Sequence, residues 1–579
     1  STTGTVIKDT NAVTVNGGIL NLADNTETIG ALTLTSGSIT GNSKILTGSS
    51  YTLNPGDGVS VSIAPILAGS GNLTKSAAGT ATLSGANTYT GTTTISAGTL
   101  TVSGSLSSTS VSNSSTLTAS GSLHNSTVIN NTGTYNVNET DTIKRIYGSG
   151  NIAIAATKTL TTGDNTNHTI SGVISGSGTL SKAGAGALTL SGTNTVANVS
   201  ISGGQVKVSG TLSDSAVVTV GTGSSYLVQA NDTIGSIAGA GTINIANDVT
   251  LSAGNDSNAT TFSGVIGGRG SFTKIGAATL TLSGANTYRG ALTISEGTLT
   301  LADNATNILP NTSNVVLANT AGAILNINGK SAETIGTLSG GGATGGNITL
   351  GDGNLTLNTR TNATYGGVIS GSGSLTKNGI AAQTLEGQST YTGGTTINAG
   401  QLKSGVDNAI LTTGAVTLTS SGDLIVKDGI SQTITNLTSS STNSRITLRG
   451  TGALTVTQSS NGTFAGVIRG RGPFTKSGNA ILTLSNDNTY TGNTTVSAGT
   501  LKVTGTLNDR NNVIVNGGTY DVDANDTVKS ISGSGGTIDI ADSVTLTENS
   551  RLNKTYAGVV AGSGTLSKAG AGALTLSGT

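Results

Sequence analysis

The stretch that decides the fold is Gly264–Asp303, GVIGGRGSFTKIGAATLTLSGANTYRGALTISEGTLTLAD. Three short segments within it, 280–282, 292–294 and 299–301, each place two aliphatic residues on either side of a threonine. This alternation is the period of a strand that buries one face. Glycine, asparagine and serine lie between the segments, and these residues favour turns. The stretch therefore predicts three short strands joined by tight turns.

The distance between the first and third segments indicates how these strands are arranged. Leu280 and Leu299 are nineteen residues apart, so an equivalent inward position recurs after one circuit of three strands and three turns. A circuit of this length suits one coil of a triangular parallel β-helix. We expect about 19–20 residues per coil.

Two sequence markers recur along the whole chain with one long period. The first is Gly-x-(Leu/Phe)-(Ser/Thr)-Lys, whose lysines are Lys75, Lys182, Lys274, Lys377, Lys476 and Lys568, at intervals of 107, 92, 103, 99 and 92 residues. The second is Thr-(Ile/Val), anchored at Ile29, Ile143, Ile234, Ile335, Ile434 and Val528, at intervals of 114, 91, 101, 99 and 94 residues. A superrepeat of about 100 residues corresponds to about five coils, which is the signature of a stacked repeat architecture.

Composition excludes the other fold classes. Glycine has no three-residue period, which rejects collagen, and the aliphatic residues alternate over strand-length runs, which disorder does not require. Frequent glycine and β-branched residues disfavour helix, and hairpin turns of the Asn-Gly type are too rare for a string of sandwiches. We predict an all-β parallel β-helix that runs as one continuous domain over residues 1–579. Gly340–Gly346, GGGATGG, is expected to be a loop that bulges from one coil.

Charge and targeting signals limit the partners. The chain has 27 basic and 27 acidic residues, spread singly, so we expect no nucleic-acid partner. It has no cysteine, no initiating methionine, no signal peptide and no apolar run of membrane-spanning length. We expect no membrane span in this segment, and we expect it to be an internal piece of a longer precursor.

The repeated motifs resemble those of a known protein family. Gly172–Gly192, GVISGSGTLSKAGAGALTLSG, and the elements Asn87–Gly91 and Ile95–Leu100 resemble the passenger-associated transport repeat of bacterial autotransporter passengers. The resemblance implies a right-handed parallel β-helix that crosses the outer membrane through a C-terminal translocator barrel, a region not in this chain. It also implies display on, or release from, the surface of a Gram-negative bacterium. Many relatives are adhesins or surface-coat proteins, and the style most resembles rickettsial surface antigens.

The motif is expected in five copies and a truncated sixth, near residues 66–104, 172–210, 264–303, 367–405, 466–505 and 558–579. Residues 176–193 and 562–579 are identical, which indicates recent duplication. Some copies depart from the pattern. Gln383 and Ser404 fall where inward aliphatic residues are expected, and Val196 and Asn198 replace the tyrosine and glycine of the turn.

Several side chains are candidate functional groups. The repeated lysine is interpreted as a solvated turn residue, in preference to a partner contact or a cross-linking nucleophile. The tyrosine of Asn-Thr-Tyr (Tyr89, Tyr288, Tyr391 and Tyr490) is interpreted as packing at a corner with its hydroxyl in water, in preference to a sugar-stacking platform. His124 and His168 are taken as surface histidines.

Three short motifs imitate ligand sites. Asp521, Asp523, Asn525 and Asp526 form the densest acidic patch but lack the glycine and glutamate of a calcium loop. Gly329-Lys330-Ser331 lacks the earlier glycine of a phosphate loop, and the glycines within 340–345 match a dinucleotide fingerprint by count only. We therefore assign no catalytic, cofactor-binding or metal-ligating residue and expect no cofactor.

The function predicted from these observations is that of a non-enzymatic, extracellular β-solenoid, displayed on the bacterial surface as an adhesin or structural rod. The expected partners are a host-cell receptor, a surface glycan or neighbouring copies of the chain. One alternative is a self-assembling filament, sheath or coat; another is a β-helical enzyme that degrades polysaccharides. An ice-binding threonine face was a third alternative, disfavoured because the Thr-x-Thr pairs are unevenly spaced along the chain.

Overall fold

Short strands that bury every second side chain make up the fold. The structure is a computed structural model that describes residues 6–302, 307–329 and 332–578. A typical strand, β10 (Thr99–Val102), turns Leu100 and Val102 inward and leaves its threonines half-buried on the outer face. No helix occurs among the described residues, and hence none that could cross a membrane. The all-β prediction is confirmed.

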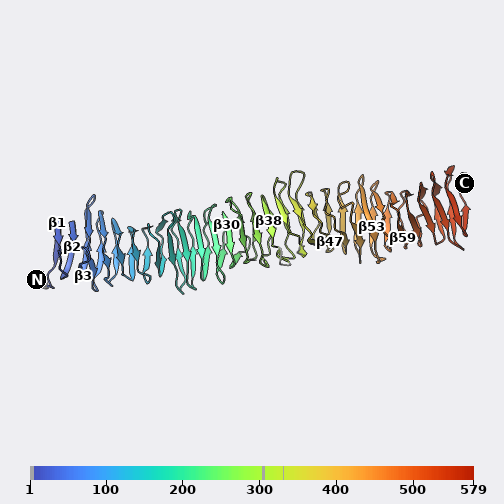
Figure 1. The fold of residues 1–579 in the computed structure, drawn as a ribbon. Coiled ribbons are helices and arrows are strands. Elements are labelled where there is room, and N and C mark those ends of the chain that lie inside the picture. Colours follow the sequence, from blue (N-terminus) through green and yellow to red (C-terminus); the bar gives the residue numbers. More distant parts are fainter. Residues whose placement is uncertain (1–5, 303–306, 330–331, 579) are drawn as a thin grey trace. The chain divides into compact units, whose positions relative to one another are not determined.

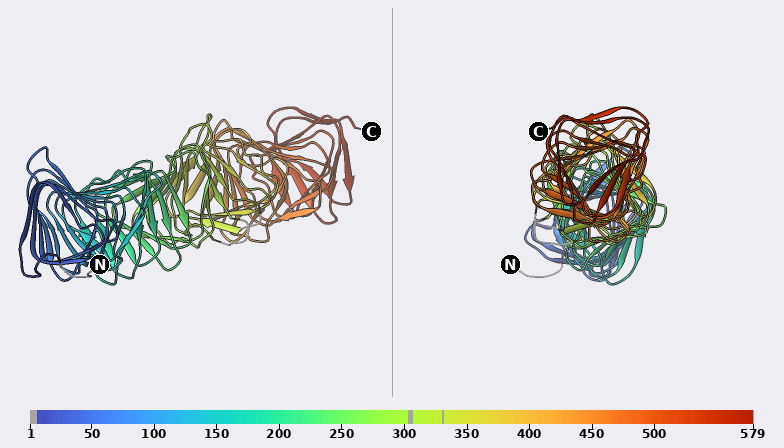
Figure 2. Two further views of the ribbon diagram at one scale, coloured as in Figure 1. Left: turned by 60° about the vertical axis from the view of Figure 1, so that its left-hand side comes forward. Right: turned by 90° about the vertical axis from the view of Figure 1, so that its right-hand side faces the viewer.

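The chain forms two compact units, Ser1–Phe272 and Thr273–Thr579. Each unit is a parallel β-solenoid, and together they hold about 28 turns. In Figure 1 the strands β1 (Val13–Asn21) to β30 (Ser236–Gly239) belong to the first unit, and β38 (Thr298–Leu301) to β59 (Ile481–Leu484) belong to the second. Figure 2 shows that the chain of each unit winds in successive coils. The prediction of one continuous domain stays a prediction.

In the first unit, coils stack in register through parallel columns. One column is β7 (Thr80–Leu83), β10, β13 (Thr116–Ala119), β16 (Thr134–Val137) and β19 (Asn151–Ile154). A second column is β6 (Asn72–Lys75), β9 (Thr93–Ile95), β12 (Ser110–Asn113), β15 (Val128–Asn131) and β18 (Arg145–Tyr147). Leu73 pairs with Thr93 and Thr93 with Val111, so successive coils take 20 and 18 residues.

Threonine pairs on the outer face line up across these coils. Thr80, Thr99 and Thr116 pair in register, as do Thr82 and Thr101. Their spacings along the chain are 19 and 17 residues, and the turns absorb the difference. Uneven spacing along the chain therefore does not prevent a regular threonine array, because register is set by hydrogen bonding between strands and not by turn length.

In the second unit, the opening stretch folds as predicted. Residues 280–282, 292–294 and 299–301 lie in β36 (Leu280–Leu282), β37 (Leu292–Ile294) and β38. Leu280 pairs with Leu299, and Leu282 with Leu301, which confirms the nineteen-residue coil.

The second unit also confirms the count of coils in a superrepeat. Lys377 lies in β47 (Leu375–Asn378) and Lys476 in β58 (Phe474–Ser477). The path between them is β47, β49 (Thr395–Ile397), β51 (Ala415–Leu418), β53 (Ser431–Thr438), β55 (Ala453–Thr457) and β58, which is five steps.

Three of the four departures from the repeat occupy inward positions, whereas Asn198 is half-buried on the outer face of β25 (Asn198–Ile201). Gln383 and Ser404 are fully buried, and Val196 is buried as the tyrosines are in other copies. Gln383 donates from Nε2 to the Leu338 carbonyl at 2.9 Å, and Ser404 donates to Oε1 of Gln432 at 2.8 Å. Polar side chains are tolerated there because each finds a hydrogen-bond partner.

Candidate functional site

The repeated lysine lies inside the solenoid in five of its six copies. Lys75, Lys182, Lys274, Lys377 and Lys476 are at most 1% exposed, whereas Lys568 is exposed. The prediction of a solvated turn lysine is therefore wrong for five copies. The alternation of the strand could have predicted this burial. The lysine follows an inward leucine or phenylalanine by two residues and so points to the same face.

Each buried lysine binds two turns together. The Lys476 Nζ donates to the carbonyl oxygens of Ser477 at 2.9 Å and Gly478 at 2.8 Å in its own turn. It also donates at 3.0 Å to the carbonyl of Ala498, one coil further on. Three acceptors satisfy the three protons of an ammonium group. The repeated lysine thus links neighbouring coils by hydrogen bonds.

The turn that receives the lysine requires glycine. Gly98, Gly204, Gly297, Gly400 and Gly499 follow the carbonyls that accept from the five lysines, and all have φ between 60° and 67°. At Gly98 a Cβ atom would lie 2.3 Å from the Ala77 carbonyl and 2.5 Å from the Lys75 Nζ. Only a residue without a side chain fits this close approach.

Burial changes the acid–base chemistry of these lysines. It lowers the pKa of Lys377 and of Lys476 to about 8, and it also lowers the pKa of Lys75 and Lys182. The physical cause is the loss of hydration around the ammonium charge. A lowered pKa favours a nucleophilic amine, but here the amine is enclosed and bonded to main-chain carbonyls.

The repeated tyrosine is also buried completely. The hydroxyl of Tyr89 lies 2.8 Å from Thr93 Oγ1, that of Tyr391 lies 2.7 Å from Thr395 Oγ1, and that of Tyr490 lies 2.5 Å from Thr494 Oγ1. Tyr288 is buried at the corresponding place. The corner position is confirmed, but the hydroxyl is buried, and in three copies a threonine of the next strand is its partner. These rings offer no platform to a ligand.

A repeated corner acid was missed by the sequence analysis. It directly precedes the Thr-(Ile/Val) marker. Five copies have an acid there and one has glutamine: Glu27, Asp141, Asp232, Glu333, Gln432 and Asp526. All six are at most 5% exposed. Each accepts from a backbone amide of the preceding coil, as Glu333 does from Ile308 at 2.9 Å and Leu309 at 3.0 Å. Aspartate, glutamate and glutamine share the place, so no single residue type marked it.

In four of the corner acids, burial favours the protonated form. Burial raises the pKa of Asp232 and Glu333 to about 7 and that of Asp141 and Asp526 to about 6. In the copy with Gln432, a neutral amide takes the same place and accepts from Ile410 N at 3.2 Å. The position therefore needs an acceptor and not a charge.

The two histidines differ. His124 is exposed as predicted, but His168 is only 8% exposed because it takes an inward position of β21 (His168–Ile170). Its Nδ1 lies 3.1 Å from the Thr166 carbonyl, and burial lowers its pKa. The interpretation of His168 as a surface residue is wrong.

The acidic patch at 521–526 is divided among other contacts. Asp521 and Asp523 both pair with Lys502, the former at 3.1 Å. Asp526 is the buried corner acid, and Asn525 accepts from Thr545 N at 2.7 Å.

The two glycine-rich motifs give no ligand loop. Gly342 and Gly345 pair across a tight turn within the 340–346 segment. Lys330 and Ser331 lie outside the described residues.

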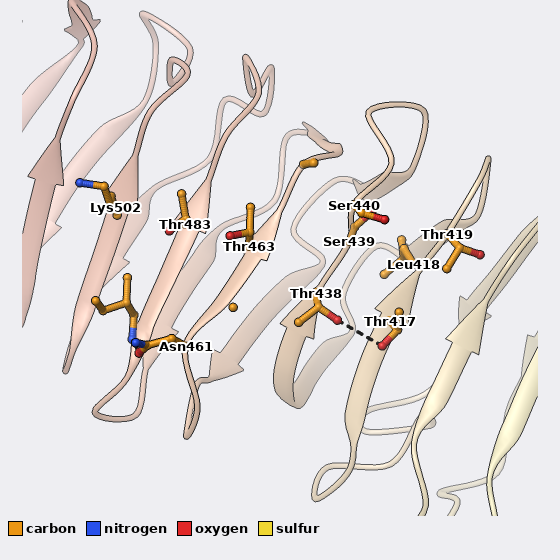
Figure 3. Close-up of a pocket in the computed structure, with 13 residues that line it drawn as sticks. Thr417, Leu418, Thr419, Thr438, Ser439, Ser440, Asn461, Thr463, Thr483 and Lys502 are labelled. Atoms are coloured by element: carbon orange, nitrogen blue, oxygen red, sulfur yellow. Dashed lines mark hydrogen bonds between the residues drawn. The ribbon is translucent and has the colours of Figure 1, made fainter.

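A shallow groove of about 690 Å³ opens on the outer surface of the second unit. Figure 3 shows Thr417, Thr438, Thr463, Thr483 and Lys502 in a row on successive strands. The hydroxyls of Thr417 and Thr438 lie 3.1 Å apart. The groove ends at Lys502, whose charge is neutralised by Asp521 and Asp523.

A second hollow, of about 570 Å³, opens in the first unit between β18 and β21. Tyr147 lines it and is 38% exposed. Arg145 lines it from the same strand, and its Nη1 donates to Thr166 Oγ1 at 2.5 Å and lies 3.4 Å from Asp164 Oδ2. We call this place the Tyr147 hollow.

Comparison with known proteins matches the repeat. The family model Passenger-associated-transport-repeat matches residues 73–102, 180–208, 272–301, 375–403 and 474–503, which lie within the first five predicted copies. The chain is 32% identical over 458 residues to the Adhesin BmaC autotransporter of Brucella suis biovar 1 (strain 1330). That match covers 72% of this chain and 13% of the relative's length, and no solved structure matches. The chain thus belongs to the autotransporter passengers that carry passenger-associated transport repeats.

Proposed function

We propose that this segment is a non-enzymatic adhesive module displayed on the bacterial cell surface. The similarity to a protein named as an adhesin supports this function. The observation that carries the proposal is the use of the repeated ionisable groups. The lysines and the corner acids are turned inward and hydrogen-bonded between coils, so the groups best suited to catalysis serve the scaffold.

The outer faces suit repeated weak contact. Threonine columns such as Thr80, Thr99 and Thr116 present hydroxyl groups at equivalent places on successive coils. A hydroxyl both donates and accepts, and many weak contacts in a row give high avidity without one strong site.

Adhesion of coated beads to cultured host cells tests the proposal. Beads that carry the chain are expected to adhere above albumin-coated beads, and beads with residues 276–377 deleted are expected to retain part of that adhesion. Adhesion no greater than the albumin control would contradict the adhesive function. Release of unsaturated or reducing products from pectin by the chain would contradict the non-enzymatic part, and size-exclusion chromatography of the same preparation detects assembly into filaments or coats.

A further inference from the structure

Among the tyrosine and phenylalanine rings, only that of Tyr147 reaches the surface in the described residues. All eleven tyrosines and four phenylalanines fall in the described residues, and the other fourteen are buried. The fold does not require an aromatic residue at this place. The positions at the same distance from the Thr-(Ile/Val) marker in other superrepeats hold Ala238, Ser339 and Ser532. Tyr147 is therefore an addition to the repeat and not a part of its packing.

Arg145 is a second addition on the same strand. Its equivalents in other superrepeats are Ser236, Thr337 and Ser530. The Arg145 guanidinium has five N–H donors, and its contacts with Thr166 and Asp164 both use Nη1. Lys144, the preceding residue, is exposed but does not line the hollow, so Arg145 is the cation of this lining. The rim of the hollow attracts an anionic group.

The remaining lining is hydrophilic. Thr132, Ser149, Asn167 and Ser171 line the hollow and are exposed. They supply hydroxyl and amide groups that both donate and accept, around one flat ring whose face carries partial negative charge. The polarised C–H groups of a sugar ring complement such a face, and its hydroxyl groups complement the rim.

We infer that the Tyr147 hollow binds an acidic saccharide, with a pyranose ring stacked on Tyr147 and a carboxylate or sulfate group paired with Arg145. This inference rests on the proposed adhesive function and names the ligand class for one site. The volume of about 570 Å³ lies within the range of small-ligand sites. A protein partner would need a broad contact with an apolar core, and the lining residues around Tyr147 are small and polar.

The groove of Figure 3 is a weaker candidate for the same chemistry. Its lining holds no aromatic side chain, and Lys502 is already paired with Asp521 and Asp523. It therefore offers hydroxyl groups without a stacking surface or an available cation. This contrast makes Lys502 a matched control.

Calorimetric titration of the full chain with three defined probes tests the inference. The probes are 3′-sialyllactose, which carries a carboxylate, a heparin-derived tetrasaccharide, which carries sulfates, and neutral lactose. At least one acidic probe is expected to bind tenfold or more tightly than lactose, and to bind more weakly as salt is added. Tyr147→Ser and Arg145→Ser are each expected to weaken binding at least tenfold, whereas Lys502→Ser leaves it unchanged. Since serine stands at both equivalent positions in another superrepeat, these variants are expected to fold, and an unchanged melting temperature verifies this.

The inference is overturned if neither acidic probe binds saturably, or if Tyr147→Ser leaves the affinity unchanged. Bead adhesion separates this failure from failure of the proposed function. If neither acidic probe binds but the beads still adhere above the albumin control, the saccharide site fails and the adhesive function stands. Adhesion that requires Tyr147 but survives enzymatic removal of cell-surface glycans would assign the hollow to a protein partner, and so would also overturn the inference.

Discussion

Replacing Glu333 with glutamine tests how the corner acids stabilise the fold. Glu333 is fully buried and accepts from the Ile308 and Leu309 amides of the preceding coil. Glutamine occupies the equivalent place at Gln432, so the substitution introduces a side chain that the fold already holds. The variant removes the ionisable group and keeps one of the two acceptor oxygens, since Oε2 of Glu333 accepts from Ile308 and Oε1 accepts from Leu309.

The sign and size of the effect follow from the pKa. Burial raises the pKa of Glu333 from 4.5 to about 7. Below pH 4.5 the carboxyl is protonated in both folded and unfolded states, and its full contribution to stability is present. As the pH rises to 7, the unfolded state loses the proton first and is favoured. The folded state therefore loses about 3 kcal/mol of local stability across this window, at about 1.4 kcal/mol for each pKa unit.

Hydrogen exchange measured between pH 4 and pH 8 detects this loss locally. After correction for the intrinsic exchange rate, protection of the Ile308 and Leu309 amides is expected to fall by about two orders of magnitude in the native chain. In Glu333→Gln the same protection is expected to be independent of pH, while amides near Asp232 retain their dependence and act as an internal control. A decline of equal size in both proteins would refute the assignment of the effect to Glu333.

Other predictions concern the buried lysines, turn glycines and corner tyrosines that hold neighbouring coils together. Lys476→Met is expected to lower stability by about 2–6 kcal/mol by thermal unfolding, because three charge-assisted hydrogen bonds outweigh about 3 kcal/mol of relieved desolvation. Lys529→Met, at an exposed position, is the control, and equal effects of the two substitutions would contradict this expectation. Gly499→Ala is expected to cost at least about 1–3 kcal/mol, because φ is 63° and the new Cβ would lie 2.2 Å from the Gly478 carbonyl. Gly56→Ala, with nothing within 4 Å, is expected to change stability by less than about 0.5 kcal/mol. Tyr391→Phe is expected to cost about 1 kcal/mol through the loss of its bond to Thr395, with the exposed Tyr147→Phe as the neutral comparison.

Periodic features of this protein were accessible from the sequence. The alternation at 280–282 and 299–301, and their separation of nineteen residues, predicted strands that the structure pairs in register. The interval between Lys377 and Lys476 predicted five coils, and the structure has five. These features repeat along the chain, so copies reinforce one another, and they depend on the backbone period more than on any one side chain.

The environment of single side chains was decided only by the tertiary structure. The turn carbonyl that accepts from Lys476 belongs to Ala498, and the amides that bind Glu333 belong to the coil before it. The Tyr147 hollow forms between strands of two coils. A short stretch of sequence does not contain both members of such a pair. Hydrophobicity alone therefore assigned the lysine ammonium groups and the tyrosine hydroxyls to water. The sequence determined that the chain coils and how often. Stacking determined which polar groups found partners inside and which remained at the surface, because contact between coils joins residues about twenty positions apart.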